Sequence, residues 1–242
     1  MLRYYFVILI SMPQIIYYIV KAHYIFCHPD KFDELYCYKI ARNMVRSVMR
    51  NGRIRTNFKG TENLPAEGGY IMYSNHQGKF DALGIIHAHD EPCSIVIDKK
   101  TAAGILTNEF IELLKGIRLD KEDIKQQMQC IKTMSDEVKK GRKFILFPEG
   151  GYDHNHNELQ EFMPGAFKAA VWSRCPIVPV ALIDSYKPFE INSLRKITTK
   201  VQFLKPIPYE EYKDFNTREI AALVKDRIGA AVKKDGTADE IK

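Results

Sequence analysis

The chain lacks any paired-cysteine motif, and this absence excludes several kinds of protein. The 242 residues include an odd number of widely spaced cysteines with no Cys-x-x-Cys pair, namely Cys27, Cys37, Cys93, Cys130 and Cys175. This spacing argues against a disulfide framework and a cysteine zinc site, and it is typical of reduced thiols in a cytosolic compartment. The chain also lacks internal repeats and low-complexity segments, so a repeat protein is not indicated.

An excess of acidic residues is missing as well. The formal net charge is +6 and the isoelectric point is about 8.9. A positive charge suits an anionic lipid surface or an acidic partner, and it suits nucleic acid less well because no nucleic-acid motif accompanies it. With 45% hydrophobic residues, the chain can form one sizeable α/β domain with a short appendage.

Long apolar runs are rare, and the longest uncharged one lies at the N-terminus. Residues 4–20 carry no charge and are bracketed by Arg3 and Lys21. As a helix this run would be about 25 Å long, just short of a comfortable bilayer span. Pro13 and Gln14 predict a kink in its middle. We expect a membrane-embedded or re-entrant anchor; a helix docked on the domain and a signal peptide are the alternatives, although no small-x-small cleavage site follows.

A second helical pattern covers residues 33–51. Ile40, Met44 and Val48 recur at helical spacing and predict one apolar face. The basic residues on a neighbouring face are Lys39, Arg42, Arg46 and Arg50. This face is either a solvated surface of a packed helix or a surface that meets an anionic membrane.

The remaining chain alternates apolar strand-like runs with helical patterns, which predicts an α/β sheet domain. Expected strands are Ile54–Phe58, Tyr70–Ser74, Ser94–Ile97, Phe144–Phe147, Ile177–Ile183 and Val201–Leu204. Expected helices are Asp81–His89, Asn108–Lys115, Asp123–Lys140, Ala166–Ser173 and Thr217–Val232. We therefore divide the chain into a membrane anchor with a basic amphipathic helix (1–52), a catalytic domain (53–234) and a polar tail (235–242).

One His-x4-Asp pair lies in a context that favours catalysis. His76 and Asp81 follow the buried strand pattern of residues 69–74. An imidazole that takes a proton from an alcohol needs a carboxylate to orient it and stabilise its charge. His28 and Asp33 have the same spacing but no preceding strand, and we interpret them as a linker or interfacial turn.

A second polar segment, Phe147-Pro148-Glu149-Gly150, closes another apolar strand. In this order and with these flanks, the two segments resemble the glycerolipid acyltransferases, specifically the 1-acylglycerol-3-phosphate acyltransferases. The resemblance covers roughly residues 55–185, including Ile177–Leu182 as a strand that lines an acyl pocket or serves as plain core.

The resemblance implies a mixed sheet flanked by helices and a membrane enzyme at the cytoplasmic face. It implies transfer of an acyl chain from a thioester of acyl carrier protein or coenzyme A to the sn-2 hydroxyl of lysophosphatidic acid, without a cofactor. His76 would be the base, Asp81 would orient it, and Glu149 with Gly150 would contact the acceptor.

The chain departs from the family pattern at several positions. After Gly150 stand Gly151 and Tyr152, where a hydroxyl residue and an arginine are usual. Lys121 takes the place of another arginine that grips the acceptor phosphate, with Arg118 and Lys79 as substitutes. These changes keep two alternatives open, namely another acceptor (glycerol-3-phosphate or a different lysolipid) and a catalytically silent lipid-binding protein. Two histidine clusters, at residues 87–90 and 153–156, do not read as strands, and we expect no metal there.

Overall fold

The computed structural model describes residues 2–236, without the side chains of residues 105 and 106. The strands are β1 (Ile54–Lys59), β2 (Ile71–Ser74), β3 (Ser94–Asp98), β4 (Ile117–Leu119), β5 (Phe144–Leu146), β6 (Ile177–Ile183) and β7 (Ile197–Phe203). The α-helices are α1 (Leu2–Ile10), α2 (Met12–Cys27), α3 (Glu34–Asn51), α4 (Asp81–Ala88), α5 (Lys99–Ala102), α6 (Ile105–Leu113), α7 (Ile124–Lys139), α8 (Lys168–Ser173), α9 (Lys187–Glu190), α10 (Tyr209–Tyr212) and α11 (Thr217–Gly236). Three 3-10 helices are η1 (Pro29–Lys31), η2 (Thr61–Asn63) and η3 (Pro164–Phe167).

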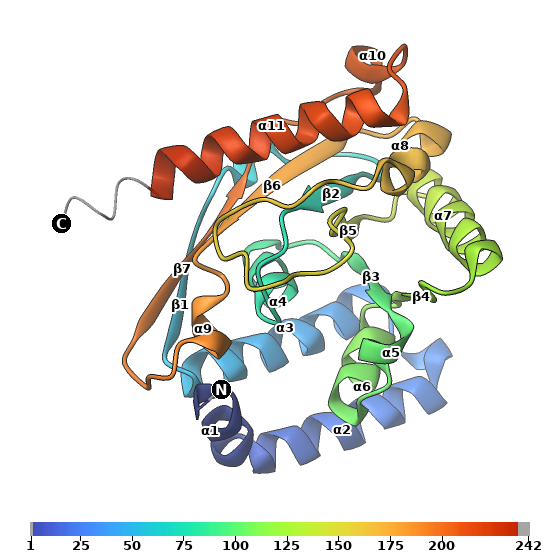
Figure 1. Cartoon of the computed structure of the whole chain (residues 1–242). Coiled ribbons are helices and arrows are strands. Elements are labelled where there is room, and N and C mark those ends of the chain that lie inside the picture. Colours follow the sequence, from blue (N-terminus) through green and yellow to red (C-terminus); the bar gives the residue numbers. More distant parts are fainter. Residues whose placement is uncertain (1, 237–242) are drawn as a thin grey trace.

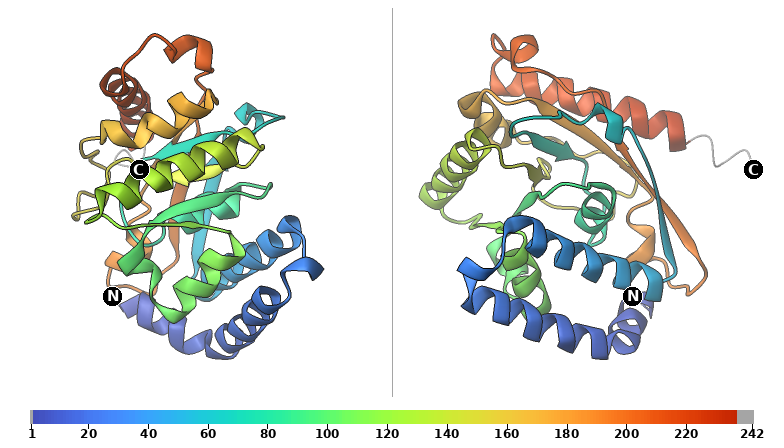
Figure 2. Two further views of the ribbon diagram at one scale, coloured as in Figure 1. Left: turned by 90° about the vertical axis from the view of Figure 1, so that its right-hand side faces the viewer. Right: turned by 180° about the vertical axis from the view of Figure 1, so that it is seen from behind.

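The strands form one seven-stranded sheet in the order β1-β7-β6-β2-β5-β3-β4. Neighbours from β6 to β4 run parallel, whereas β7 is antiparallel to β6 and parallel to β1. The predicted mixed α/β sheet is confirmed. Helices cover both faces, with α11, α7 and α8 on one side and α3 and α4 on the other (Figures 1 and 2).

Alternation along the central strands builds a core on each face of the sheet. On β2, Met72 packs into the cluster that holds α3 and α4 residues, while Ile71 and Tyr73 pack into the cluster beneath α7, α8 and α11. All seven residues of β6 are buried, and six of them divide between the two clusters in the same way, with Val178, Val180 and Leu182 in the first and Ile177, Ala181 and Ile183 in the second. Continuous apolar strands are expected where both faces of a parallel sheet are covered.

The N-terminal run forms two helices instead of one. α1 and α2 are bent by 70° at Ser11, just before Pro13, which confirms the predicted kink. Asn51 of α3 holds the bend, since its Nδ2 donates to Ser11 Oγ at 2.7 Å and to Gln14 Oε1 at 2.9 Å. Among residues 2–236, no single helix is long and apolar enough to cross a membrane, and the bent pair meets the test only jointly.

Helix α3 is part of the main core. Cys37, Ala41 and Val45 are buried together with residues of β2 and β6, so the predicted apolar face of this helix packs on the sheet. Asp33 caps the helix by accepting from the Tyr36 N–H at 2.6 Å, and His28 Nδ1 contacts the Tyr24 carbonyl at 2.9 Å. The second His-x4-Asp pair therefore serves two separate turns.

The predicted helix starts and the predicted C-terminal tail agree with the structure only in part. Asp123, where a helix was expected to begin, caps α7, whereas Asn108, the expected start of another helix, lies inside α6, which begins at Ile105. The proposed tail begins inside α11, where Asp235 forms an ion pair with Lys59 at 2.8 Å. Residues 237–242 of that tail lie outside the described residues.

Candidate active site

The site lies where the parallel strands end. The carboxyl ends of β6, β2, β5, β3 and β4 meet at one edge of the sheet, because these neighbours run in the same direction. His76 follows β2 and Glu149 follows the adjacent β5. This arrangement explains how two segments about seventy residues apart in sequence meet, as loops at such an edge commonly form binding sites.

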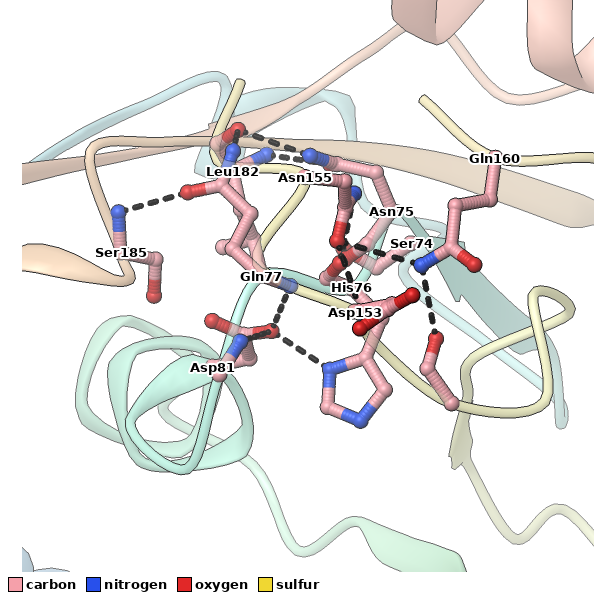
Figure 3. Close-up of polar contacts among 12 residues, drawn as sticks. Ser74, Asn75, His76, Gln77, Asp81, Asp153, Asn155, Gln160, Leu182 and Ser185 are labelled. Carbon is pink, nitrogen blue, oxygen red and sulfur yellow. Dashed lines mark hydrogen bonds and ion pairs between the residues drawn. The ribbon is translucent and has the colours of Figure 1, made fainter. Parts of the chain in front are cut away.

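His76 and Asp81 form the predicted pair. His76 Nδ1 lies 2.6 Å from Asp81 Oδ2, and the aspartate is fully buried at the first turn of α4 (Figure 3). The same oxygen accepts from the backbone N–H groups of Gln77 and of Gly78, the latter at 2.9 Å. Asp81 therefore fixes the imidazole through Nδ1 and leaves Nε2 for a substrate proton.

Aromatic rings set the orientation of the His76 imidazole further. Phe147 stacks on it with ring centroids 4.4 Å apart, and Tyr152 meets it edge-on at 4.7 Å. The His76 side chain keeps 19% of its surface exposed. Tyr152, at the position where the resemblance leads us to expect an arginine, is thus a wall of the site.

Glu149 is buried beside the histidine without a conventional partner. It is 6% exposed, and neither carboxylate oxygen has a hydrogen bond among the described residues. Burial raises the pKa of Glu149 to about 7; the charge on Asp81 raises it further, and the nearby N–H groups of His76 and Gln160 lower it in part. A buried carboxyl group with free oxygens can bind a polar ligand atom.

The backbone conformation at position 150 requires a glycine. Its φ of +72° lies in the left-handed region, and a Cβ would come within 2.6 Å of Met163 Cε. A side chain here would strain the turn that carries Glu149.

Two polar residues beside the histidine were missed by the sequence reasoning. Asn75 exchanges two hydrogen bonds with the backbone of Leu182, at 3.0 and 2.8 Å. Gln77 donates to the same carbonyl at 2.9 Å and accepts from Ser185 N at 2.7 Å. These amides tie the His76 turn to the end of β6. The residues of the Ile177–Leu182 strand are themselves buried in the core, and whether the strand also lines an acyl pocket stays a prediction. The sequence feature that could have indicated Asn75 and Gln77 is the run of polar residues directly after a buried strand.

The loop between β5 and η3 covers the histidine from the other side. Asn155 Nδ2 donates to the His76 carbonyl at 3.3 Å, and Gln160 donates to Asn155 Oδ1 at 3.1 Å (Figure 3). Asn157 Oδ1 accepts from Gln77 Nε2 and from Asp184 N, each at 2.9 Å. The sequence contained no spacing pattern that would indicate these contacts.

The predicted cations are not gathered at the histidine. Lys121 Nζ pairs with Asp98 at 3.0 Å, and it follows β4, three strands from β2. At about 4.8 Å per strand, that is about 14 Å from the His76 strand. Arg118 is held by Glu112 at 2.6 Å.

Lys79 is the cation nearest to His76 in sequence. Its Nζ lies 4.9 Å from the ring centre of Tyr4 in α1, and it has no ion pair among the described residues. The Lys79 side chain is exposed. It therefore joins the site loop to the N-terminal helix.

The histidine clusters have other contacts. His89 is buried, with Nε2 2.7 Å from the Tyr70 hydroxyl and Nδ1 2.7 Å from the Glu91 carbonyl. His154 and His156 each contact a different oxygen of Glu190 at 3.2 Å. Within the described part of the chain, no group of three metal-binding side chains comes together.

Fold and site together define an α/β protein with a carboxylate-oriented histidine at the carboxyl edge of a mixed sheet, a class suited to general-base chemistry on a hydroxyl group. The chain belongs to the acyltransferase family, since the model of that family matches residues 55–183.

Individual relatives agree with this family. The chain is 28% identical over 194 residues to 1-acyl-sn-glycerol-3-phosphate acyltransferase alpha of Ovis aries, covering 77% of this chain and 66% of the relative. It is 27% identical over 157 residues to 1-acyl-sn-glycerol-3-phosphate acyltransferase of Salmonella typhimurium, covering 64% and 63% of the two chains. The chain therefore spans just under two thirds of the length of these relatives.

A solved structure shares the fold. The crystal structure of the 1-acyl-sn-glycerophosphate acyltransferase of Thermotoga maritima matches 96% of this chain and 94% of its own, with a TM-score of 0.77 and 17% identity. At that identity the match concerns the fold alone.

Proposed function

We propose that the protein is a membrane-associated O-acyltransferase that acylates the sn-2 hydroxyl of lysophosphatidic acid to give phosphatidic acid. The observation that carries this proposal is the 2.6 Å contact of His76 Nδ1 with buried Asp81 at the end of β2. The family of the chain and the names of its relatives support it.

The proposed reaction follows from that geometry. His76 Nε2 takes the proton of the acceptor hydroxyl while Asp81 stabilises the imidazolium that forms. The hydroxyl oxygen attacks the thioester carbonyl; the new C–O bond forms, the C–S bond breaks, and the leaving sulfur takes the proton back from His76. The donor is the thioester of acyl carrier protein or coenzyme A, and no cofactor is required by this scheme.

The N-terminal helices support a location at a bilayer surface, and we propose the cytoplasmic face of the cell membrane. On α2, Met12, Ile16 and Val20 recur every four residues, and all three are exposed. The exposed fraction is 57% for Ile16 and 65% for Val20. An exposed apolar helix face of this kind suits insertion into one leaflet.

The acceptor phosphate needs a cation, and two lysines compete for this role. Lys121 occupies the family position but pairs with Asp98 about three strands away from His76. Lys79 lies three residues from His76 and has no acidic partner among the described residues. We propose Lys79 as the first candidate, because of its place in the His76 loop and its lack of an acidic partner, and Lys121 as the second. Arg118 ranks last because Glu112 and Asn108 already hold its guanidinium group.

A different acceptor is the second candidate function. The observation that favours it is the Gly151–Tyr152 segment, where a wall of the site replaces the usual hydroxyl and cation. Glycerol-3-phosphate or another lysolipid would then be acylated by the same His76–Asp81 pair.

A transfer assay with both donors and a panel of acceptors tests the proposal. We expect activity with lysophosphatidic acid and a loss of about 10²- to 10⁴-fold in His76→Ala. His28→Ala, the second His-x4-Asp pair, should leave transfer in detergent unchanged. If His76→Ala kept more than about a tenth of the turnover, the general-base role would be wrong.

The same assay compares Lys79→Ala, Lys121→Ala and Arg118→Ala by acceptor KM. The variant that removes the phosphate cation should raise KM about ten- to a hundredfold, as expected for a charged hydrogen bond. If none of the three raises it, the acceptor is not a phosphate monoester.

A further inference from the structure

A groove between α2 and α3 carries charges that the proposed reaction does not use. It encloses a cavity of about 610 Å³. α2 contributes Gln14, Tyr17 and Tyr18 to its lining, and α3 contributes Asn43, Arg46 and Arg50. On each helix these residues are three or four apart, so they share one face. Figures 1 and 2 show the two helices side by side, and none of the active-site residues described above lines the groove.

The charge in the groove is positive and uncompensated. Neither Arg46 nor Arg50 has an ion pair or a side-chain hydrogen bond among the described residues, and no acidic residue lines the cavity. A second cavity of about 340 Å³ continues the groove past Arg42 to Lys39. Arg42 is neutralised by Asp90 at 2.8 Å, so Arg46 and Arg50 are the two arginines of the groove without an ion pair among the described residues.

The groove also adjoins the apolar surface of α2. Tyr17 lines the cavity and is 55% exposed, and its neighbour Ile16 belongs to the exposed apolar face. A molecule with a phosphate in the groove could therefore lay its chains along Ile16 and Val20. Guanidinium groups bind phosphate oxygens in pairs, and tyrosines favour the level of lipid headgroups.

We propose that this groove binds the phosphate of an anionic membrane phospholipid, as a site separate from the acceptor site. Arg46 and Arg50 bind the phosphate oxygens, while Tyr17 and Asn43 border the headgroup. The site rests on the proposed position of α1 and α2 at a bilayer surface. It gives the protein a preference for anionic membranes that apolar insertion alone would not provide.

Vesicle flotation of the full chain tests the site. Binding is compared between vesicles of phosphatidylcholine and vesicles of equal parts phosphatidylcholine and phosphatidylglycerol. We expect wild-type protein to prefer the anionic vesicles, and Arg46→Gln/Arg50→Gln to lose about tenfold or more of that preference while binding neutral vesicles as before. The control Lys132→Gln/Arg218→Gln removes two exposed charges from α7 and α11 and should keep the preference.

Two further measurements distinguish a specific phosphate site from general electrostatic attraction to an anionic membrane. Arg46→Lys/Arg50→Lys keeps the charge but loses the paired guanidinium geometry, so it should lose part of the preference. Titration calorimetry with inorganic phosphate should give no saturable binding. An unchanged preference in the Gln variant, full retention in the Lys variant, or saturable phosphate binding that the Gln variant abolishes would each overturn the lipid site.

The experiment also separates this inference from the proposals on which it rests. Ile16→Glu/Val20→Glu should lower binding to neutral and anionic vesicles alike, and normal neutral binding by this variant would overturn the bilayer position and the lipid site with it. Absence of acyl transfer would contradict the proposed reaction and leave the vesicle result unaffected.

Discussion

At the scale of single residues, the Asp81 carboxylate does two things at once. It holds His76 Nδ1 and it accepts the backbone N–H groups of Gln77 and Gly78. An amide in its place can still accept from the backbone, but it cannot stabilise an imidazolium. Charge and position are therefore separable by a single substitution.

Asp81→Asn should reduce kcat by about 10²- to 10⁴-fold with little change in acceptor KM, because the loss falls on the transition state. Steady-state kinetics with circular dichroism as a check on folding would measure it. Asp90→Asn, which removes a surface carboxylate paired with Arg42, is the matched control and should keep kcat. A kcat near that of wild type in Asp81→Asn would contradict the charge role.

Glu149 predicts a change in acceptor binding near neutral pH. Its pKa is raised to about 7 by burial, so the group is neutral below that pH and charged above it. A buried negative charge beside the site would repel an anionic acceptor. The acceptor KM of the wild type, divided by that of the Glu149→Gln variant, should therefore rise as the pH increases through 7. A constant ratio of the two KM values across pH 6 to 8 would show that Glu149 does not face the acceptor.

At the scale of elements, the sequence predicted those whose burial produces a clear pattern. All six expected strands are present, because apolar runs such as Ile177–Ile183 are buried on both faces. β4 was missed as a strand since it has three residues, each only partly buried. The four-residue helices α5, α9 and α10 were missed because one helical turn has no periodicity to detect.

The loop of residues 147–163 marks the other limit of sequence reasoning. His76 and Asp81 are five residues apart, so their pairing follows from a short spacing and a helix start. The contacts of Asn155 and Asn157 depend on β2, β5 and β6 being neighbours, which only the assembled sheet determines. For the same reason the sequence could name Glu149 but not its lack of a partner.

This loop should matter for catalysis because it positions Tyr152 and Glu149. Asn157→Ala removes three hydrogen bonds that tie the loop to Gln77 and Asp184. We expect kcat/KM to fall about ten- to a hundredfold, as small misplacements of reacting groups do. Hydrogen exchange should increase within residues 150–160. Asn57→Ala on the exposed side of β1 is the control, and equal kinetics of the two variants would contradict the role of the loop.

At the scale of the whole molecule, the N-terminal helices are part of the fold as well as candidates for the membrane. Ala22 and Ile25 of α2 belong to the main core, and Arg3 of α1 is buried with its guanidinium donating to the Pro188 carbonyl at 3.5 Å. Removing residues 1–22, the simplest test of an anchor, would therefore also disturb packing. Substitution of exposed residues such as Ile16 separates membrane binding from folding.

Two buried titratable groups, His89 and Glu149, predict how the stability of the protein depends on pH. Burial lowers the pKa of His89 to about 4, so between pH 6.5 and 4 the unfolded chain binds a proton that the folded chain does not. Acid therefore removes stability through His89, by up to about 3 kcal/mol. Glu149 acts with the opposite sign: its pKa of about 7 means that the folded chain binds the extra proton between pH 7 and 4.5, so stability rises as pH falls.

The two effects oppose each other in the wild type, and single variants should separate them. Relative to the wild type, His89→Gln should gain stability as pH falls from 6.5 to 4, because only the wild type loses stability through His89. Glu149→Gln should lose stability relative to the wild type as pH falls from 7 to 4.5, because it lacks the compensating proton. Urea unfolding midpoints at a series of pH values would measure both slopes. Each prediction states in which direction the variant departs from the wild type. If the unfolding midpoint of a variant changed with pH as that of the wild type does, burial would not shift the pKa of the group that the variant lacks.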